Sequence, residues 1–157
     1  MKMPTRAFAA LLFISYGCGS DSGGSSGAQG KKLSDLSLEE RMQLCASTID
    51  ETQAIAAGSC TLGGLDAPAK ADCEATRDDC NATTLPATAA SCQDPNAVED
   101  FSDCTTIRVG QVETCLKEAS TFFAGLSCDA VGQAPALPSC LGALEQGCPV
   151  LLYGAGQ

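Results

Sequence analysis

The sequence predicts an all-α fold in which disulfide bonds staple helical hairpins, with about four main helices. Apolar residues recur at intervals of three and four along several stretches, which is the spacing of one face of an α-helix. No stretch of useful length alternates apolar and polar residues with the period of two that a β-strand requires. The chain also contains 11 cysteines, far more than an ordinary domain of 157 residues. These observations favour short helices joined covalently.

The first helix is expected to begin after Ser37 and to end by Gly58. Ser37 and Glu40 have the spacing of a capping box, in which a serine hydroxyl and a glutamate satisfy backbone amides at a helix start. The apolar stripe of this helix is expected to contain Leu38, Met42, Cys45, Ile49 and Ala56.

Three further helices are expected along the chain. The second covers about 68–80, because proline is favoured in the first turn of a helix. The third has the strongest pattern, since Val109, Val112, Leu116, Ala119, Phe123 and Leu126 are spaced by three or four residues. The last covers about 138–146. Residues 81–108 show the least regular pattern, with a short helix expected in 85–90.

The amino terminus has the pattern of an export signal over residues 1–17. Lys2 and Arg6 precede an apolar run over 7–14, and Gly17 is a small residue at the end of the signal. The apolar run is shorter than the roughly 20 residues that a membrane-spanning helix needs. We therefore expect a signal peptide and not a membrane span.

The number of cysteines is odd, and Cys18, which directly follows the predicted signal, is the cysteine that we expect to remain outside the disulfides. Residues 18–32 are rich in glycine and serine, which predicts a flexible tether. Residues 33–157 are then expected to form a disulfide-rich helical domain. Without Cys18, ten cysteines remain between Cys45 and Cys148, an even number that allows five disulfides. Disulfides persist in periplasmic and extracellular compartments.

The spacing of the cysteines suggests two tandem hairpins, over 36–80 and 109–148, joined by a linker over 81–108. In each antiparallel hairpin the first cysteine would face the fourth, and the second would face the third. The predicted disulfides are therefore Cys45–Cys80, Cys60–Cys73, Cys115–Cys148 and Cys128–Cys140, with Cys92–Cys104 in the linker. Ten cysteines allow on the order of a thousand pairings, so this pattern is one hypothesis among many. Convergence on a common hairpin length would explain the repeated spacing equally well.

Charge and residue usage exclude several classes of function. Nine basic residues include Lys2 and Arg6, so the chain without its signal has seven against 19 acidic residues, a net charge of −12. Such a surface repels phosphate backbones, and we expect no nucleic-acid partner. The chain has no histidine and no Cys-x-x-Cys pair, so we expect no catalytic residues, no metal site and no cofactor.

Two acidic arrangements leave alternatives open. Neighbouring carboxylates such as Asp78 and Asp79 could act as an acid and a base, although surface acids of this kind are usually only solvated. The segment from Asp94 to Asp103 is rich in side-chain oxygens and could bind calcium, but it lacks the spacing of an EF-hand.

The chain resembles the small, cysteine-rich lipoproteins of unassigned activity that some Gram-negative bacteria encode. The signal ending in Gly17-Cys18, the glycine- and serine-rich tether and the segments 36–45 and 109–115 carry this resemblance. The resemblance implies that Cys18 is lipidated and anchors the protein to a membrane of the cell envelope. The resemblance also implies that the anchor lies in the outer membrane, because Gly19, and not aspartate, follows the cysteine.

The function expected from the sequence is that of a lipid-anchored, non-enzymatic interaction module with an unknown protein partner. The alternative is a carrier of an apolar small molecule, in which Phe122, Phe123 and Leu126 line a cavity inside the helical bundle. We favour the alternative that the same three residues simply fill a core. A hydrolase that uses carboxylates is a third, weaker hypothesis.

Overall fold

A computed structural model describes residues 28–83 and 88–153, and its backbone is helical, which confirms the all-α class. The elements are η1 (Leu33–Asp35), α1 (Leu38–Ser47), α2 (Ile49–Gly64), α3 (Lys70–Thr83), η2 (Ser91–Gln93), α4 (Val109–Ala124), η3 (Cys128–Ala130), α5 (Ser139–Gly147) and α6 (Val150–Tyr153). Within the described ranges no β-strand forms, and the extended backbone makes one isolated antiparallel bridge, between Lys32 and Arg108.

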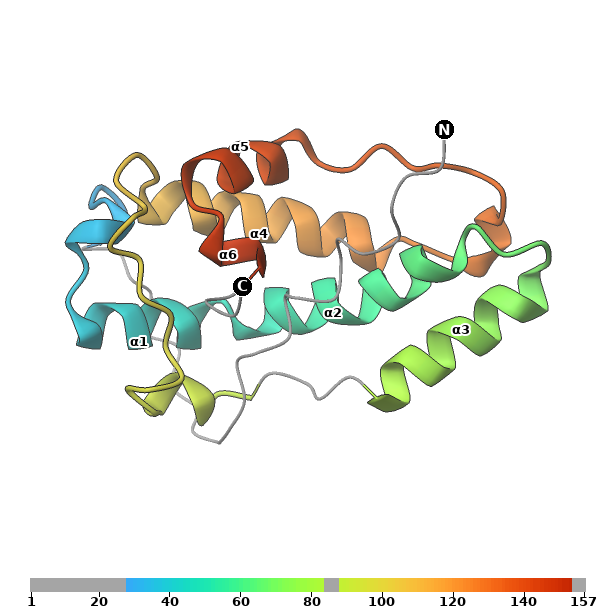
Figure 1. The fold of residues 1–157 in the computed structure, drawn as a ribbon, viewed down its shortest axis with the longest axis horizontal. Helices are drawn as coiled ribbons and strands as arrows, with labels where there is room; N and C mark the ends of the chain where they lie inside the picture. Colours follow the sequence, from blue (N-terminus) through green and yellow to red (C-terminus); the bar gives the residue numbers. More distant parts are fainter. Residues whose placement is uncertain (1–27, 84–87, 154–157) are drawn as a thin grey trace.

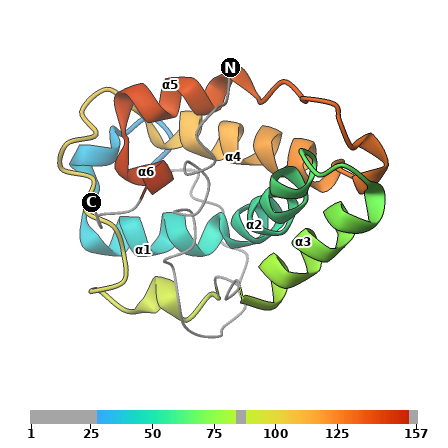
Figure 2. The ribbon, with the colours of Figure 1, turned by 45° about the vertical axis from the view of Figure 1, so that its right-hand side comes forward.

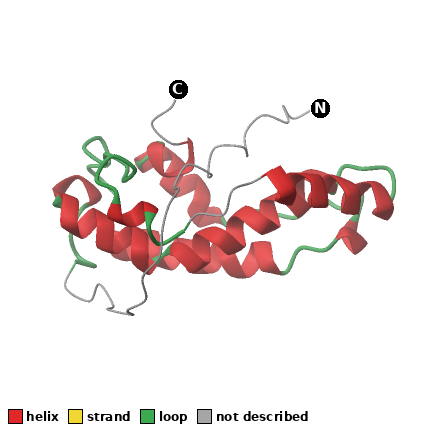
Figure 3. Cartoon of the chain, turned by 90° about the horizontal axis from the view of Figure 1, so that it is seen from below, coloured by secondary structure: helices red, strands yellow, loops and turns green. Residues whose placement is uncertain are grey.

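Helix α2 lies at the centre of the arrangement and packs against α4 on one side and α3 on the other (Figure 1). Helix α5 covers the opposite side of α4, and α3 is the outermost helix in both side views (Figures 1 and 2). Helices α2 and α4 run in the same direction. Ile55 packs with Ala119 and Phe123, and Leu65, just after α2, packs with Cys128, just after α4. The view from below shows the same elongated layers (Figure 3).

The expected first helix is present, but it is interrupted at Thr48 and extends beyond Gly58. Its start agrees with the sequence, because the Ser37 hydroxyl accepts from the Glu40 amide and the Glu40 carboxylate accepts from the Ser37 amide. At the interruption the Thr48 hydroxyl donates to the Leu44 carbonyl at 2.9 Å, and the Thr52 hydroxyl donates to the Thr48 carbonyl at 2.8 Å. Such back-bonding bends helices, which separates α1 from α2.

The predicted stripe of this first helix is wrong at Leu38, whereas Met42, Cys45 and Ile49 are partly buried. Leu38 is 39% exposed, whereas Leu44 is the buried residue of α1. In α2 the buried face contains Ile55 and, as predicted, Ala56. The change of direction at Thr48 rotates the face that meets the core, so one continuous stripe cannot describe both helices.

The other helices lie close to their predicted positions. Helix α3 covers Lys70–Thr83 against an expected 68–80, and α5 covers Ser139–Gly147 against 138–146. Helix α4 buries Val109, Val112, Ala119 and Phe123, as the spacing predicted, together with Cys115. The expected short helix at 85–90 falls partly outside the described residues, and its described part, 88–90, is not helical.

The core consists of three neighbouring apolar clusters along α4. The first surrounds the start of α4 and contains Leu33, Leu36, Leu44, Phe101, Ile107, Val109, Val112 and Leu144 with three half-cystines. The second joins α2 to α4 through Ile55, Ala119 and Phe123. The third joins Leu65, Cys73 and Cys128 at the far end. Each cluster is small, which fits the low aromatic content of the chain.

Ordered structure begins before Leu33, so the predicted tether over 18–32 is too long. Three backbone amides join this segment to the start of α4: Leu33 donates to Ile107 at 2.9 Å, Val109 to Lys31 at 3.0 Å and Gly110 to Gln29 at 3.1 Å. Leu33 is 1% exposed and draws the preceding residues against the core. The predicted signal over 1–17, Cys18 and most of the tether lie outside the described residues.

All five predicted disulfides are wrong, because the structure pairs every one of these cysteines with a different partner. Cys45–Cys80, Cys60–Cys73, Cys92–Cys104, Cys115–Cys148 and Cys128–Cys140 are absent. The observed pairs are Cys45–Cys92, Cys60–Cys80, Cys73–Cys128, Cys104–Cys148 and Cys115–Cys140, with Cα–Cα distances of 4.6–5.7 Å. These distances lie within the usual range for a disulfide.

The nested pattern failed because the two hairpins do not form independent units. Since α2 and α4 run parallel, the turn after α2 and the turn after α4 lie at the same end of the molecule. Cys73 therefore meets Cys128 across the two hairpins. The linker is tied in the same way, because Cys92 bonds to Cys45 in α1 and Cys104 bonds to Cys148 after α5.

Within the first hairpin, the register of α2 and α3 decides the partner of Cys60. Gly64, one turn after Cys60, approaches Cys73 so closely that a Cβ on it would lie 2.8 Å from the Cys73 carbonyl oxygen. Cys60 consequently lies further along α3, opposite Cys80, and the two form a disulfide.

Candidate functional site

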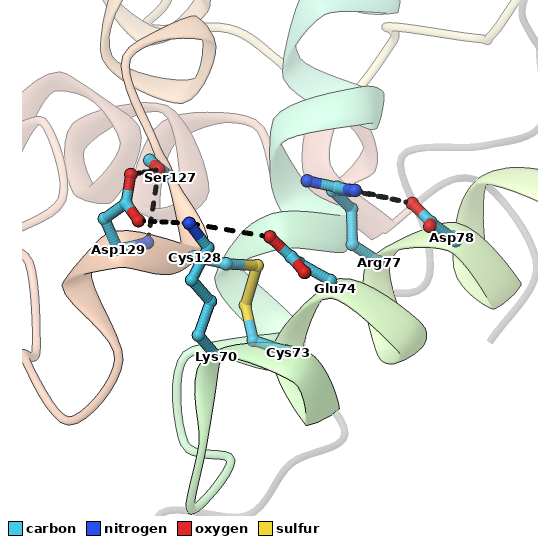
Figure 4. Close-up of a disulfide and its surroundings, with 8 residues drawn as sticks. All are labelled: Lys70, Cys73, Glu74, Arg77, Asp78, Ser127, Cys128 and Asp129. Atoms are coloured by element: carbon cyan, nitrogen blue, oxygen red, sulfur yellow. Dashed lines mark hydrogen bonds and ion pairs between the residues drawn. A yellow bond between two sulfur atoms is a disulfide. The ribbon is translucent and has the colours of Figure 1, made fainter.

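The clearest cluster of interacting charged side chains joins the start of α3 to η3 and surrounds the Cys73–Cys128 disulfide (Figure 4). The Lys70 ammonium donates to Asp129 Oδ1 at 2.5 Å and lies 3.7 Å from Glu74 Oε1. Lys70 and Glu74 are one turn apart on α3, so their side chains share a face. The disulfide brings α3 and η3 close enough for Lys70 to reach Asp129, which lies 59 positions away in the sequence.

The short helix η3 positions the carboxylate of this cluster. The Ser127 hydroxyl accepts from the Asp129 amide at 3.2 Å and donates to Asp129 Oδ2 at 3.0 Å. One carboxylate oxygen therefore faces Ser127 and the other faces Lys70. Both charged side chains remain largely in solvent, with exposed fractions of 56% for Lys70 and 71% for Asp129.

The electrostatics hold both groups in their charged forms. Hydrogen bonds from Lys70 and Ser127, together with the positive charge of Lys70, lower the pKa of Asp129. The hydrogen bond to Asp129 and the negative charges of Asp129 and Glu74 raise the pKa of Lys70. A lysine with a raised pKa is a poor general base, and a carboxyl with a lowered pKa is a poor general acid. The arrangement is thus suited to fastening η3 to α3.

A second exposed pair fixes the amino-terminal segment to α1. Lys31 donates to Glu40, whose other oxygen completes the capping box with the Ser37 amide at 3.0 Å. The hydrogen bond from Lys31, followed by the one from the Ser37 backbone, lowers the pKa of Glu40. The Arg108 guanidinium adds a bond to the Gly30 carbonyl. These contacts reinforce the backbone pairing of residues 29–33.

Several acidic residues considered for catalysis or calcium binding pair with a nearby basic side chain or accept from a nearby backbone amide. Asp78 lies 2.8 Å from the Arg77 guanidinium on the same helix, and Glu74 faces Lys70. In the acidic loop, Asp94 accepts from the Asn96 amide and Asp100 accepts from the Ser102 amide, both as local turns. Among the residues that the structure describes, no three cysteine or acidic side chains gather as metal ligands.

Of the three apolar residues proposed to line a cavity, Phe123 lies between α2 and α4. Phe123 is 1% exposed and belongs to the cluster with Ile55 and Ala119, and Phe122 and Leu126 pack against that cluster. Gly58 lies directly against Phe123, since a Cβ on Gly58 would be 2.5 Å from the Phe123 Cβ. The rings of Phe122 and Phe123 meet edge to face at 5.2 Å.

No sequence signal could have found the Lys70–Asp129 pair. Lysine and aspartate are common surface residues, and their partnership depends on a disulfide that sequence spacing did not predict. The capping box and the local Arg77–Asp78 pair, by contrast, involve near neighbours in the sequence.

Comparison with known proteins produced no family model, no curated protein and no solved structure that matches this chain. Among the described helices, none has both the length and the apolar character that crossing a bilayer requires.

The Lys70–Asp129 pair leads to a prediction about pH. Asp129→Asn should lower the pKa of Lys70, because the largest cause of its upward shift is the hydrogen bond to Asp129. In the wild type the pKa of Asp129 is lowered in the folded state. Its ionised form therefore stabilises the fold above the unfolded-state pKa of about 3.9, and this stabilisation is lost as the pH falls through the pKa of the folded state. The variant should therefore lose less stability on acidification than the wild type does.

Nuclear magnetic resonance titration of the lysine side chains would measure the pKa of Lys70 directly. Asp103→Asn serves as the control, because Asp103 is an exposed acid outside the cluster that Lys70 forms with Glu74, Ser127 and Asp129. An unchanged pKa of Lys70 in Asp129→Asn, or an equal change in both variants, would contradict the assignment.

Proposed function

We propose that this protein is a lipid-anchored, non-enzymatic component of the bacterial cell envelope that acts as an interaction module. The observation that carries the proposal is the cysteine count. Ten of the 11 cysteines form five disulfides within the helical domain, which leaves Cys18 as the remaining one. A fold with this many disulfides suits an oxidising compartment outside the cytoplasm. Cys18 directly follows the sequence pattern of an export signal.

The geometry of the anchor supports a domain that is displayed close to a membrane. Nine residues separate Cys18 from Ala28, the first described residue. A fully extended chain spans at most about 3.3–3.6 Å per residue, so residue 28 would lie within roughly 35 Å of the lipidated cysteine. Residue 28 is joined to the start of α4 by the backbone pairing of residues 29–33. The anchor would therefore join the domain near the start of α4.

The chemistry of the described side chains supports binding over catalysis. The cluster with the most distinctive electrostatics keeps Lys70 protonated and Asp129 ionised, so neither group is poised to exchange a proton near neutral pH. The contacts of Phe123 with Ile55 and Gly58 favour a filled core over the cavity that an apolar carrier needs. We therefore propose that the protein is an interaction module, in preference to a carrier of an apolar small molecule.

Metabolic labelling tests the anchor. The full chain, expressed with its signal in a Gram-negative host, should incorporate an alkyne analogue of palmitate and fractionate with the outer membrane. Cys18→Ser should incorporate none, and Ser20→Ala should incorporate as much as the wild type. Intact-mass measurement should find one lipidated residue and no free thiols. An unlabelled wild-type protein, or a label that survives in Cys18→Ser, would overturn the proposal.

A further inference from the structure

The chain between η3 and α5 contains an extended segment, residues 133–138. It forms no helix, turn or bridge, and in both side views it runs along an outer edge of the molecule (Figures 1 and 2). At its ends, the Gln133 amide donates back to η3 and the Pro138 carbonyl accepts from α5. Within the described part of the chain, no backbone hydrogen bond involves residues 134–137. The middle of the segment therefore offers its backbone groups to a partner.

Two prolines hold this segment in an extended conformation. A proline ring fixes its own φ at about −65° and keeps the residue before it out of the helical region. Pro135 and Pro138 therefore restrict themselves and also Ala134 and Leu137. Pro138 has a φ of −52° and a ψ of 128°, which is extended backbone.

Disulfides fix the chain on both sides of the segment. Cys128 bonds to Cys73 before it, and Cys140 bonds to Cys115 after it. A segment whose ends and dihedral angles are already fixed loses little conformational entropy when a partner binds it. The segment is thus preorganised for recognition as an extended chain.

The loop between Cys92 and Cys104 also has a disulfide at each end, but its backbone turns. Asp94 and Asp100 each accept from the amide two residues further on, which is the pattern of a local turn. Phe101 of the same loop is buried. This loop therefore presents no comparable extended chain.

The exposed side chains of the segment indicate the class of partner. Its two prolines are partly buried, whereas four residues are exposed: Gln133, Ala134, Ala136 and Leu137. Leu137 is 40% exposed. A groove lined by aromatic residues binds proline-rich segments, and the prolines of this segment face it poorly. A cleft that binds an extended chain, by backbone hydrogen bonds and by pockets for side chains, fits the exposed surface better. The substrate cleft of an endopeptidase is of this kind.

The prolines also decide the register in such a cleft. In an extended chain, the amides of alternate residues point to the same edge. One edge offers the amides of Ala134 and Ala136, whereas the other loses one donor at Pro135. We therefore expect pairing through Ala134 and Ala136. The bond after Ala134 leads to a proline nitrogen, whereas the bond after Ala136 leads to the ordinary amide of Leu137.

We propose that residues 133–138 form an inhibitory loop for a serine endopeptidase whose small primary specificity pocket accepts the methyl group of Ala136. Elastase has a small pocket at this position, whereas trypsin has an aspartate that selects a basic side chain. The proposal rests on the proposed interaction module, whose partner it names, and it does not depend on the lipid anchor.

The disulfides favour inhibition over degradation. The protease serine adds to the Ala136 carbonyl, and the peptide bond to Leu137 breaks. The Leu137 nitrogen takes the proton that the protease histidine had received from the serine. Cys128 and Cys140 still hold the two new ends, so the Leu137 amine stays beside the acyl group. Its attack on the ester expels the serine and forms the peptide bond again.

Inhibition assays with the full oxidised chain test the proposal. The chain carries Cys18→Ser so that it is secreted without lipid. Pancreatic elastase and trypsin are assayed with chromogenic peptides. Elastase should be inhibited with an inhibition constant of about 1 µM or lower, and trypsin should not be inhibited. Mass spectrometry should find the chain intact, or cut only between Ala136 and Leu137 with both parts still joined by disulfides.

A change of specificity separates this loop from any other inhibitory surface. Ala136→Arg should inhibit trypsin about a hundredfold better than the unsubstituted loop does, and should inhibit elastase correspondingly less. Ala134→Arg, the matched control, places the same side chain at an exposed position before Pro135 and should leave trypsin uninhibited. Both positions are exposed, so neither variant disturbs the core.

Three results would overturn the proposal. They are an uninhibited elastase, trypsin inhibition by both arginine variants or by neither, and a rapid loss of inhibition as the chain is degraded. Labelling at Cys18 is measured on a different form of the chain, so failure of the anchor and failure of the inhibitory loop are distinguishable.

Discussion

Replacing Cys73 and Cys128 together by alanine is expected to lower the free energy of unfolding by about 4 kcal/mol. The disulfide joins positions 55 residues apart, the longest separation of the five, and restricts the unfolded chain accordingly. Both cysteines are also buried in the cluster that fastens α3 to the end of α2 and α4. Chemical denaturation of the wild type and of the double variant would measure the difference.

The same variant checks the disulfide connectivity. With the pairing in the structure, both partners of one bond are removed, so thiol titration of the denatured protein should find no free cysteine among residues 45–148. The nested pairing would instead leave Cys60 and Cys140 free. A matched control, Cys60→Ala with Cys73→Ala, should expose two thiols, those of Cys80 and Cys128. Two free thiols in the Cys73/Cys128 variant would contradict the structure.

Gly58→Ala is expected to destabilise the fold by about 1–3 kcal/mol, because it inserts a methyl group where α2 touches α4. A Cβ at this position would lie 2.5 Å from the Phe123 Cβ and 2.6 Å from its carbonyl carbon, so one helix would have to move. The backbone atoms of α4 cannot rotate away as the end of a flexible side chain could. Thermal and urea denaturation would measure the loss.

Gly63→Ala is the matched control, since it makes the same chemical change in the same helix. A Cβ at Gly63 would meet nothing within 4 Å. Alanine is a better helix former than glycine, so this variant should be neutral or more stable by up to about 1 kcal/mol. Equal destabilisation by both substitutions would show that the contact with Phe123 is not the cause.

Short-range features could be predicted from the sequence. The Ser37–Glu40 capping box and the buried stripe of α4 depend on residues three or four positions apart, and both are present. The interruption at Thr48 was missed, although threonine hydroxyls that bond to the preceding turn are a known cause of helix bending. The tether predicted over 18–32 from its glycine and serine content is too long, because the backbone of Lys31 and Lys32 pairs with the segment before α4.

The long-range features of the candidate site could not be predicted. Lys70 meets Asp129 only because the Cys73–Cys128 disulfide joins the two hairpins, and the spacing of the cysteines had suggested that each hairpin closes on itself. An even number of cysteines predicts that disulfides form, but it contains no information about which helices lie side by side.

The sequence by itself determined the helical class, the approximate positions of α3, α4 and α5, and the presence of five cysteine pairs. These features depend on the local periodicity of apolar residues, on helix capping and on the even number of cysteines that remain without Cys18. The tertiary structure alone decided that α2 and α4 run parallel, and with that the partner of every cysteine. The physical reason is that cysteines bond only where packing brings their Cα atoms within about 7 Å. That packing follows from the way small apolar faces such as Ile55, Gly58 and Phe123 fit together.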